Sequence, residues 1–353
     1  MLKDREQPIS LPAVEVFRGE ILESLHRATA VACHADGRVV FTLGDPYREV
    51  FPRSGLKPFQ ALAQVETGAV DTLGISHEEL ALSCASHSAE PGHINTVRRW
   101  LKRLGMDAGH LACGPRPPHD ASVARALFLA GEQETPLHNN CSGKHTGMLS
   151  ACRQMGWPVE GYQELDHPLQ QHIARALGEL SGESSLPRTA IDGCSAPTFA
   201  MPLASAARAF AQLADPSRLA ATRQQAVERI FAAMRAHPWH VAGTHRSCTD
   251  FITACPDTVV KMGAEGFYGI SLRRLGLGVA IKVDDGAERA GQVAAGAVLE
   301  ALKAVAPEHT DMVAAWTRKP LINAVGLRVG SVRPSQLWVD RLHSSLHPGL
   351  HLQ

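Results

Sequence analysis

The sequence predicts an α+β fold in which one largely antiparallel central sheet is built from both chain ends, with a helical region inserted between them. Residues 28–45 contain two apolar runs on either side of Asp36-Gly37, a dipeptide typical of a tight hairpin turn. Residues 267–286 contain a second pair of strand-like runs. Between about residues 55 and 250, apolar residues recur at helical spacing instead. Such a chain buries its sheet against its helices.

Further segments along the chain predict the individual helices and strands of this fold. Helical periodicity is clearest in three stretches, which are residues 94–105, 168–180 and 217–237. After the strand pair FYGISLRR and GLGVAIKVDDG, residues 287–306 predict a helix that begins past Asp284-Asp285-Gly286. The run NAVGLRVGSV, residues 323–332, predicts one further strand.

We therefore expect one compact unit over residues 1–353. Its sheet-containing part takes residues 8–50 plus 255–335, and its mainly helical part takes residues 51–254. The last part, residues 336–353, ends in LHSSLHPGLHLQ and is expected to form a loose tail.

Composition and charge favour a globular protein that handles a small molecule. Apolar residues make up 44% of the chain, which is enough for a full core. Lysine plus arginine equals aspartate plus glutamate at 35 each, without long charged runs, so we expect neither nucleic acid nor membrane as a partner. The first residues, MLKDREQPIS, carry charges where a signal peptide needs an apolar core, which predicts a cytoplasmic location. The 8 cysteines form no C-x-x-C pair, so a disulfide framework is not expected.

The stretch FPRSGLKPFQAL places Ser54 three residues before Lys57, and residues with this spacing share one face of a helix. A serine hydroxyl becomes a good nucleophile when a base removes its proton, and a lysine can be that base when burial or nearby positive charge keeps it neutral. The alternative is a surface lysine one turn from a helix-capping serine.

Five polar clusters rich in small residues interrupt the apolar pattern. They are RSGLKPFQA, SCASHSAEPGH, HNNCSGKHTGML, DGCSAPTFAMP and VVKMGAEGFYGIS. Each alone is compatible with a loop, whereas together they favour a site. In the last cluster, Lys261 precedes a glycine at the start of a strand, which places an amine at a sheet edge that other backbone can approach closely.

In this order and spacing, the five clusters resemble the L-asparaginase II family of the Rhizobium type, over about residues 12–335. NNCSGKHTGML and DGCSAPTFAMPL are the most specific segments. The resemblance implies a fold similar to serine β-lactamases and serine-dependent glutaminases, which agrees with a sheet formed by both chain ends. It also implies a homodimer.

The resemblance implies two serine–lysine pairs, Ser54 with Lys57 and Ser86 with Lys261. They would hydrolyse the side-chain amide of L-asparagine to L-aspartate and ammonia. Ser54 would attack and Lys57 would accept its proton, while Ser86 and Lys261 would pass a proton to the leaving nitrogen. Alternatives are a glutaminase or a β-lactam hydrolase on the same scaffold, because one methylene in a pocket changes binding by only about 1 to 3 kcal/mol. A non-catalytic, zinc-dependent amino-acid-binding protein is a further alternative.

The resemblance also implies zinc as a cofactor, held by Cys141, Lys144 and Cys194 beside the serine–lysine pairs. From the residues alone, the two cysteines are too far apart in sequence to signal a zinc site and would be assigned as buried thiols. A lysine must be neutral to bind a metal ion. Three alternative ligands lie in the same clusters or near them: His138, His145 and Cys248.

Substrate recognition requires partners for an α-ammonium and an α-carboxylate. Acidic candidates for the ammonium are Glu90, Asp192 and Asp250, and basic candidates for the carboxylate are Arg53 and Arg246. Each of these side chains could instead form a surface ion pair.

Overall fold

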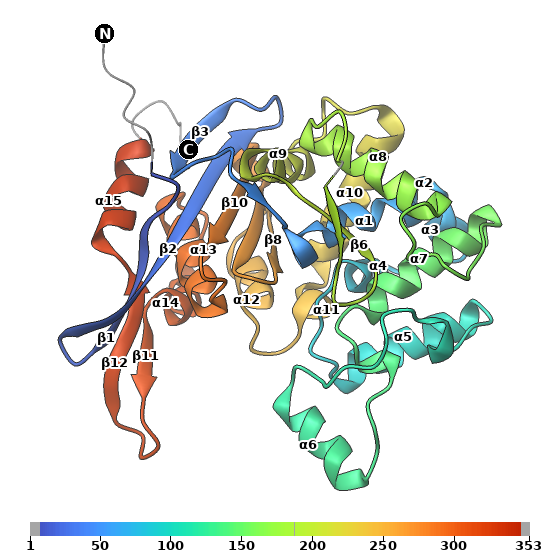
Figure 1. The fold of residues 1–353 in the computed structure, drawn as a ribbon, viewed down its shortest axis with the longest axis horizontal. Coiled ribbons are helices and arrows are strands. Elements are labelled where there is room, and N and C mark those ends of the chain that lie inside the picture. Colours follow the sequence, from blue (N-terminus) through green and yellow to red (C-terminus); the bar gives the residue numbers. More distant parts are fainter. Residues whose placement is uncertain (1–7, 187, 347–353) are drawn as a thin grey trace. The chain divides into compact units, whose positions relative to one another are not determined.

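The computed structural model describes residues 8–186 and 188–346, shown in Figure 1. The chain forms two compact units, each built from separate segments. Unit 1 comprises Met1–Gly55, Met201–Asp215 and Asp250–Gln353, and unit 2 comprises Leu56–Ala200 and Pro216–Thr249. The chain therefore passes between the units four times. Within the described residues, no helix is long and apolar enough to span a bilayer.

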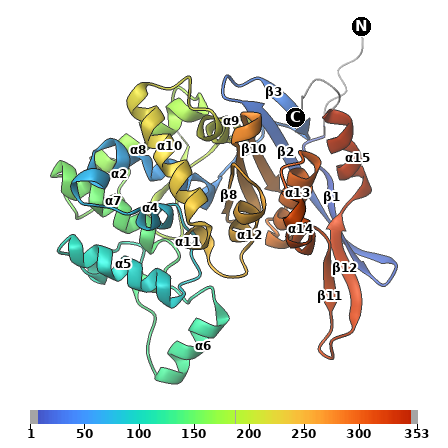
Figure 2. The same cartoon turned by 180° about the vertical axis from the view of Figure 1, so that it is seen from behind.

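Unit 1 contains an antiparallel sheet in which strands from both chain ends alternate in space. The strand order is β11-β12-β1-β2-β10-β9-β8, and β3 pairs with β2. The strand bounds are β1 Leu11–Arg18, β2 Ile21–His34, β3 Val39–Leu43, β8 Thr258–Gly263, β9 Phe267–Leu272, β10 Leu277–Val283, β11 Lys319–Ile322 and β12 Arg328–Pro334. The expected sheet from both ends is confirmed, and so are the hairpin at Asp36-Gly37 and the strand pair over residues 267–286. Figure 2 shows β11 and β12 as a long hairpin at the end of this sheet.

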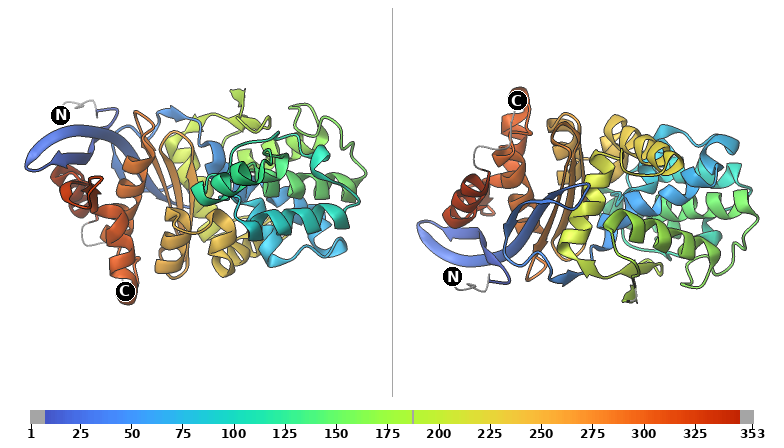
Figure 3. Two further views of the ribbon diagram at one scale, coloured as in Figure 1. Left: turned by 90° about the horizontal axis from the view of Figure 1, so that it is seen from below. Right: turned by 90° about the horizontal axis from the view of Figure 1, so that it is seen from above.

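Helices cover both faces of the sheet of unit 1, as Figure 3 shows. One face carries α9 (Leu203–Ala214), and the other carries α13 (Glu288–Ala301), the helix predicted after Asp284-Asp285-Gly286. A Cβ atom at Gly278 would lie 2.1 Å from the Ala207 oxygen, and one at Gly269 would lie 1.9 Å from the Phe210 ring. Glycine at these two strand positions therefore lets α9 approach the sheet closely.

The C-terminal segment differs from the expected loose tail. Helix α15 (Gln336–Ser345) begins where the Ser335 hydroxyl accepts a hydrogen bond from the Trp338 backbone N–H at 3.1 Å. Trp338 and Leu342 are almost completely buried, and this apolar pair holds the helix on the rest of unit 1. The remainder of the predicted tail, residues 347–353, lies outside the described residues.

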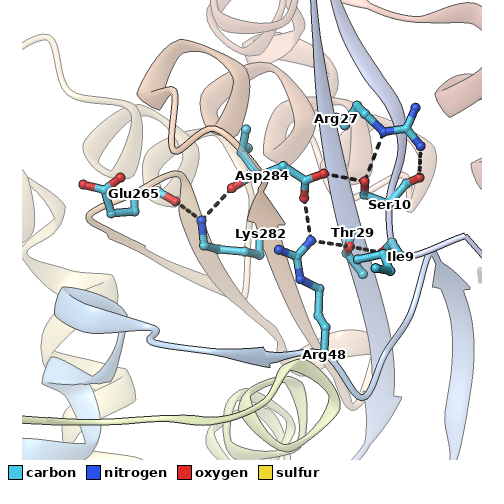
Figure 4. A network of polar contacts seen from close by, with 9 residues as sticks. Ile9, Ser10, Arg27, Thr29, Arg48, Glu265, Lys282 and Asp284 are labelled. Atoms are coloured by element: carbon cyan, nitrogen blue, oxygen red, sulfur yellow. Dashed lines mark hydrogen bonds and ion pairs between the residues drawn. The ribbon is translucent and has the colours of Figure 1, made fainter. Parts of the chain in front are cut away.

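A polar network joins the N-terminal segment to the end of β10 (Figure 4). The Asp284 carboxylate accepts hydrogen bonds from Ser10 and, at 2.5 Å, from Arg48, which also donates to the Thr29 hydroxyl at 3.1 Å. Thr29 in turn donates to the Ile9 carbonyl oxygen at 2.7 Å. The carboxylate thus accepts from donors of two chain segments, and together with the Thr29 contacts these bonds tie residues 9–10 to β2 and β10.

Unit 2 is mainly helical, as the periodicity predicts. Its helices are α1 Lys57–Gln60, α2 Leu62–Glu66, α3 Ala69–Thr72, α4 His77–Ser83, α5 Pro91–Arg103, α6 Ala121–Ala130, α7 Ser142–Met155, α8 Pro168–Ser181, α10 Ala221–Ala236 and α11 Pro238–Ala242, while α12 Ser247–Ala254 crosses into unit 1. Short strand pairs interrupt the part expected to be mainly helical: β5 Thr189–Ile191 pairs with β6 Pro197–Phe199 in unit 2, and β4 Glu49–Val50 pairs with β7 Met201–Pro202 in unit 1.

Helix α7 is the central helix of unit 2, and its residues from Ser142 to Cys152 are all buried. A Cβ atom at Gly143 would lie 2.4 Å from the Leu82 carbonyl oxygen, and one at Gly147 would lie 2.8 Å from the Ser83 hydroxyl. The glycines of SGKHTG therefore allow α7 to pack closely against α4. This packing fixes the start of α7 beside the loop that follows α4.

Candidate active site

Ser54 lies in a short 3-10 turn, Arg53–Leu56, that rests on the β8–β9 hairpin. A Cβ atom at Gly263 would lie 2.1 Å from the Pro52 carbonyl oxygen, and one at Gly55 would lie 2.3 Å from the Phe267 ring. Arg53 has a φ of 52°, a left-handed conformation that turns the chain sharply before Ser54. The expected close backbone approach at the VVKMG strand therefore occurs, and the backbone that approaches is that of the Ser54 turn.

Lys261 lies on β8, an edge strand of the sheet in unit 1, two residues before Gly263. Its side chain is 1% exposed, and Nζ donates to the Met262 carbonyl oxygen at 2.8 Å. The predicted position of this lysine at a sheet edge is confirmed. Because the Ser54 turn packs on Gly263, one strand carries both Lys261 and the support for Ser54.

Lys57 begins α1 and is 2% exposed, so it is not a surface lysine. Its Nζ atom donates to the Ala85 carbonyl oxygen at 2.6 Å and to the Ser86 hydroxyl at 3.0 Å. The family resemblance implies a pair of Ser86 with Lys261, whereas within unit 2 the amine that contacts Ser86 is that of Lys57. The pairing of Ser86 with Lys261, and that of Ser54 with Lys57, stay predictions.

Ser86 belongs to the loop after α4, which three hydrogen bonds hold in place. The Ser86 N–H donates to the Val241 carbonyl at 3.0 Å, and the His87 N–H donates to the Asn140 carbonyl at 3.3 Å. The Ser88 hydroxyl donates to the Ala242 carbonyl at 3.0 Å. The loop that carries Ser86 is therefore attached both to α11 and to the segment before α7.

The structure brings Cys141, Lys144 and Cys194 together in unit 2, although Cys194 is remote in sequence. The Lys144 amine donates to the Cys194 sulfur at 3.0 Å, and all three side chains are buried. A hydrogen bond from Cys141 and the charge of Lys144 hold the pKa of Cys194 well below its ordinary value despite burial. The same hydrogen bond, together with burial, raises the pKa of Cys141. Burial lowers the pKa of Lys144, but the two sulfurs raise it more, so the cluster contains a thiolate next to an ammonium group.

Of the three alternative ligands, His145 lies nearest this cluster, as the residue next to Lys144. Its Nδ1 atom contacts the Tyr162 hydroxyl at 2.6 Å, and an interaction of the ring with the Cys194 sulfur acts to raise its pKa. Burial, followed by the charge of Lys144, lowers the pKa of His145 to about 4, so the ring is neutral. His138 is engaged by the Thr135 N–H at 3.0 Å, and Cys248 is buried in α12.

Among the described residues, no group of three or more histidine, cysteine, aspartate or glutamate side chains is arranged to hold a metal ion. A metal ion at the Cys141–Cys194 cluster would therefore need the Lys144 amine as its third protein ligand. Two thiols and an amine within one buried cluster are nitrogen and sulfur donors of the kind that zinc prefers. The donor set is consistent with the zinc that the sequence resemblance implies.

Two substrate-binding candidates of unit 2 lie on facing loops. The Glu90 carboxylate accepts the Thr244 N–H at 2.7 Å and the Thr244 hydroxyl at 2.7 Å, and Arg246 donates to the Ser88 hydroxyl at 3.3 Å. Gly243 has a φ of 115°, and a Cβ atom there would lie 2.4 Å from a Glu90 carboxylate oxygen. Glu90 and Arg246 thus connect residues 88–90, directly after Ser86, to residues 243–246.

The other three candidates lie in other segments of the chain. Asp192 lies in the turn that leads to Cys194, where its charge adds to the rise in the pKa of Lys144. Arg53 and Asp250 belong to unit 1, and the Asp250 carboxylate accepts the Trp316 indole N–H at 2.8 Å. Asp250 therefore has a structural partner of its own.

Sequence reasoning missed His87 and Asn139, which hold the site loops. Asn139 donates to the Cys113 carbonyl at 2.8 Å and accepts the Cys141 N–H at 3.0 Å. His87 is completely buried between Ser86 and Ser88. Both residues stand inside the polar clusters, and a large polar side chain within a segment of small residues was the signal that could have indicated them.

Most of the chain matches a known protein family. The model of the family described as L-asparaginase II matches residues 14–334, a range that includes all five polar clusters. No match to a curated protein was found. The chain is similar to the crystal structure of a β-lactamase from Mycobacterium bovis, with 16% identity, 77% of this chain and 94% of that chain covered, and a TM-score of 0.39. It is similar to a putative β-lactamase from Bacteroides dorei, with 16% identity, 73% and 88% covered, and a TM-score of 0.39. Because the family match spans nearly the whole chain, this protein belongs to the L-asparaginase II family.

Proposed function

We propose that the protein is an L-asparagine amidohydrolase that forms L-aspartate and ammonia through a serine–lysine acyl-enzyme mechanism. Membership of the L-asparaginase II family supports an amidohydrolase that acts on a small molecule. The observation that carries the proposal is the buried Lys57 amine, 3.0 Å from the Ser86 hydroxyl and three residues from Ser54 in the chain. Both hydrogen-bond acceptors of this amine are uncharged oxygens, and one of them is the hydroxyl of a serine that the family resemblance assigns to the site.

In the proposed reaction, the Ser54 oxygen attacks the side-chain carboxamide carbon as Lys57 accepts the hydroxyl proton. A C–O bond forms, the C–N bond breaks, and the nitrogen leaves as ammonia after it receives a proton. Ser86 and Lys261 supply the path for that proton. Water then attacks the β-aspartyl ester, the serine recovers its proton, and L-aspartate is released. The contact between Lys57 and Ser86 supports this path because it connects the base of the first pair to the serine of the second.

We propose zinc at Cys141, Lys144 and Cys194, with His145 beside it. Bound there, zinc would supply a positive centre that orients an oxygen atom of the substrate. To bind it, Cys141 and Lys144 must each lose a proton, whereas Cys194 is poised as a thiolate. The segment that carries Cys141 also accepts a hydrogen bond from the loop that carries Ser86, so within unit 2 the cluster is joined to that loop.

For the amino-acid end of the substrate, we propose that Glu90 and Asp192 hold the α-ammonium and that Arg53 and Arg246 hold the α-carboxylate. Glu90 lies four residues after Ser86 and is bonded to Thr244, and Arg246 donates a hydrogen bond to Ser88 in the same loop as Ser86. These positions support the assignment. We further propose the homodimer that the resemblance implies, which sedimentation velocity of the purified chain tests directly.

The function is tested by ammonia release from the purified protein with L-asparagine and L-glutamine, and by the absorbance change on ring opening of a chromogenic cephalosporin. We expect turnover of L-asparagine that Lys57→Met abolishes. Lys102→Met, which removes an exposed lysine on α5, is the matched control and should leave turnover unchanged. Faster turnover of glutamine or of the cephalosporin would replace the substrate assignment. No turnover of any of the three would overturn the proposal.

A further inference from the structure

The imidazole of His87 is completely buried immediately after Ser86. Its Nδ1 atom accepts a hydrogen bond from the Ala89 backbone N–H at 3.1 Å. An atom that accepts from an N–H carries no proton itself, so the ring proton of the neutral imidazole resides on Nε2. This contact holds the loop just beyond Ser86 in a tight turn, in which Ala89 has a φ of 62°.

The Nε2 atom of His87 points at the first residue of α7. It lies 2.8 Å from the Ser142 hydroxyl, and this hydroxyl is 3.0 Å from the Leu137 carbonyl oxygen. The hydroxyl can donate its single proton to Leu137 and accept the Nε2 proton, so every hydrogen bond in this chain of contacts has one donor and one acceptor. The His87 N–H also donates to the Asn140 carbonyl at 3.3 Å. His87 therefore attaches the Ser86 loop on both sides of Cys141.

Two further rings fix the plane of the imidazole. His93, on α5, stacks on His87 at a centroid distance of 5.2 Å, and Trp239, on α11, stacks on His93 at 3.9 Å. Burial lowers the pKa of His87 well below its ordinary value, and the charges of His93, Lys57, Arg246 and His138 act in the same direction. The ring thus stays in the neutral, Nε2-protonated form that its contacts require.

We propose that His87 is a positioning residue that holds the Lys57–Ser86 pair and the Cys141–Lys144 segment in one fixed arrangement. It acts through Ser142, the residue between Cys141 and Gly143, and it touches none of the reacting atoms. The consequence of this proposal for turnover rests on the proposed function. Its consequence for zinc affinity rests on the proposed zinc site, whereas its consequence for the backbone of the two loops rests on neither.

Two substitutions of His87 separate its two contacts. In His87→Gln the amide nitrogen replaces Nε2 and can still donate to Ser142, whereas in His87→Asn the shorter side chain can accept from Ala89 but cannot reach Ser142. We expect His87→Asn to lower kcat about tenfold or more, with KM within about threefold of wild type, and to weaken zinc binding about tenfold in competition with a chromophoric chelator. His87→Gln should stay within about threefold of wild type in all three quantities.

His167 provides the matched control because its Nδ1 atom also accepts the N–H two residues ahead, from Leu169 at 3.2 Å. Its Nε2 atom contacts the Pro158 carbonyl at 3.0 Å, away from the zinc ligands. We expect His167→Asn to lower the melting temperature without changing kcat or zinc affinity. Ser142→Ala should reproduce the loss in His87→Asn, and the double variant should lose no more than Ser142→Ala. Ser142→Ala also tests the proposal if His87→Asn does not fold.

Hydrogen–deuterium exchange of residues 84–90 and 139–146 supplies a readout that needs neither activity nor zinc. Both segments should exchange faster together in His87→Asn and stay protected in His87→Gln. The proposal is overturned if His87→Asn leaves kcat, zinc affinity and exchange within twofold of wild type, or if His87→Gln is as damaging as His87→Asn. A wild-type protein that releases no ammonia would overturn the proposed function alone, because zinc affinity and exchange would still decide the role of His87.

Discussion

The amine of Lys144 lies 3.0 Å from the sulfur of Cys194, a residue that reaches it from the turn between β5 and β6. Cys141 completes this cluster one helical turn before Lys144. If these side chains bind zinc, Cys141→Ser and Cys194→Ser should each reduce zinc to well below one ion per chain. Both should weaken substrate affinity more than turnover. Elemental analysis of dialysed protein measures the zinc, with Cys152→Ser as a control for loss of a buried thiol. Stoichiometric zinc in both variants would remove the assignment.

Ser54→Ala and Lys57→Ala should each remove nearly all hydrolysis of asparagine, because a nucleophile and its base act as one unit. The double variant should be no slower than the slower single variant. Ammonia release measures all three, and circular dichroism confirms that each folds. A double variant much slower than either single would show that the two residues do not share one step.

Lys261→Met should lower kcat/KM strongly and move the acidic limb of the pH–rate profile to higher pH. In the proposed mechanism Lys261 is a positive neighbour of the base Lys57, and its removal would make that base easier to protonate, so that more of it is inactive at a given acidic pH. Lys282→Met is a close control, because Lys282 lies on β10 of the same sheet and its amine also donates to a backbone carbonyl, that of Glu265 at 2.5 Å. This variant should leave the acidic limb in place. An unmoved limb and near-normal turnover in Lys261→Met would limit VVKMG to a structural role.

Glu66→Gln should destabilise the protein at neutral pH by about 2 kcal/mol, the scale of a hydrogen bond to a charged group. The Glu66 carboxylate contacts His172 at 2.7 Å and Arg223 at 2.5 Å. Burial raises the pKa of Glu66, but His172 and Arg223 together lower it by more than burial raises it, so the pKa in the folded protein lies below the ordinary value. The stabilisation is therefore present above the unfolded pKa and lost as pH falls through the folded pKa. Urea unfolding at neutral and acidic pH should show the difference from wild type shrink in acid.

Gly243→Ala should raise the KM for asparagine, because its Cβ atom would push against Glu90 and disturb the loop that carries Arg246. Gly105→Ala is the control: Gly105 has a φ of 70°, but a Cβ atom there meets nothing within 4 Å. Both variants place a Cβ atom on backbone with positive φ, which costs of order 1–3 kcal/mol, and Gly243→Ala alone also has the clash. Equal KM values in the two variants would mean that the 243–246 loop takes no part in binding.

Local patterns were sufficient to predict part of the sheet and four of the longer helices, whereas β1, β11 and α7 were not predicted. Asp36-Gly37 and the alternation around it predicted the β2–β3 hairpin, and helical spacing predicted α5, α8, α10 and α13. The same patterns could not show that α9 belongs to the sheet-containing unit, because a helical period does not reveal which layer a helix covers. The burial of α15 depends on two residues, Trp338 and Leu342, within a polar segment, and so it was predicted as a tail.

The candidate site was predicted as a set of residues but not as a set of contacts. The resemblance gave Cys141, Lys144 and Cys194 as a group, and the structure brings them together. The contact of Lys57 with Ser86 depends on how the loop after α4 is held by Asn140, Val241 and Ala242, which are distant in sequence. Such long-range attachment leaves no periodic signal in the chain.

The antiparallel pairing of β2 with β10 joins His34 to Leu277, so the centre of the sheet cannot close until most of the chain exists. On a ribosome that adds about 5–20 residues per second, the N-terminal strands wait roughly 10 to 50 s for their partner. Residues 56–200 and 216–249, which form the helical unit, emerge during that interval. The order of synthesis thus lets the helical unit fold first, while β1, β2 and β3 remain an exposed hairpin edge open to pairing with other chains. Production of this protein should accordingly respond to chaperones that bind nascent strands more than to conditions that stabilise the finished fold.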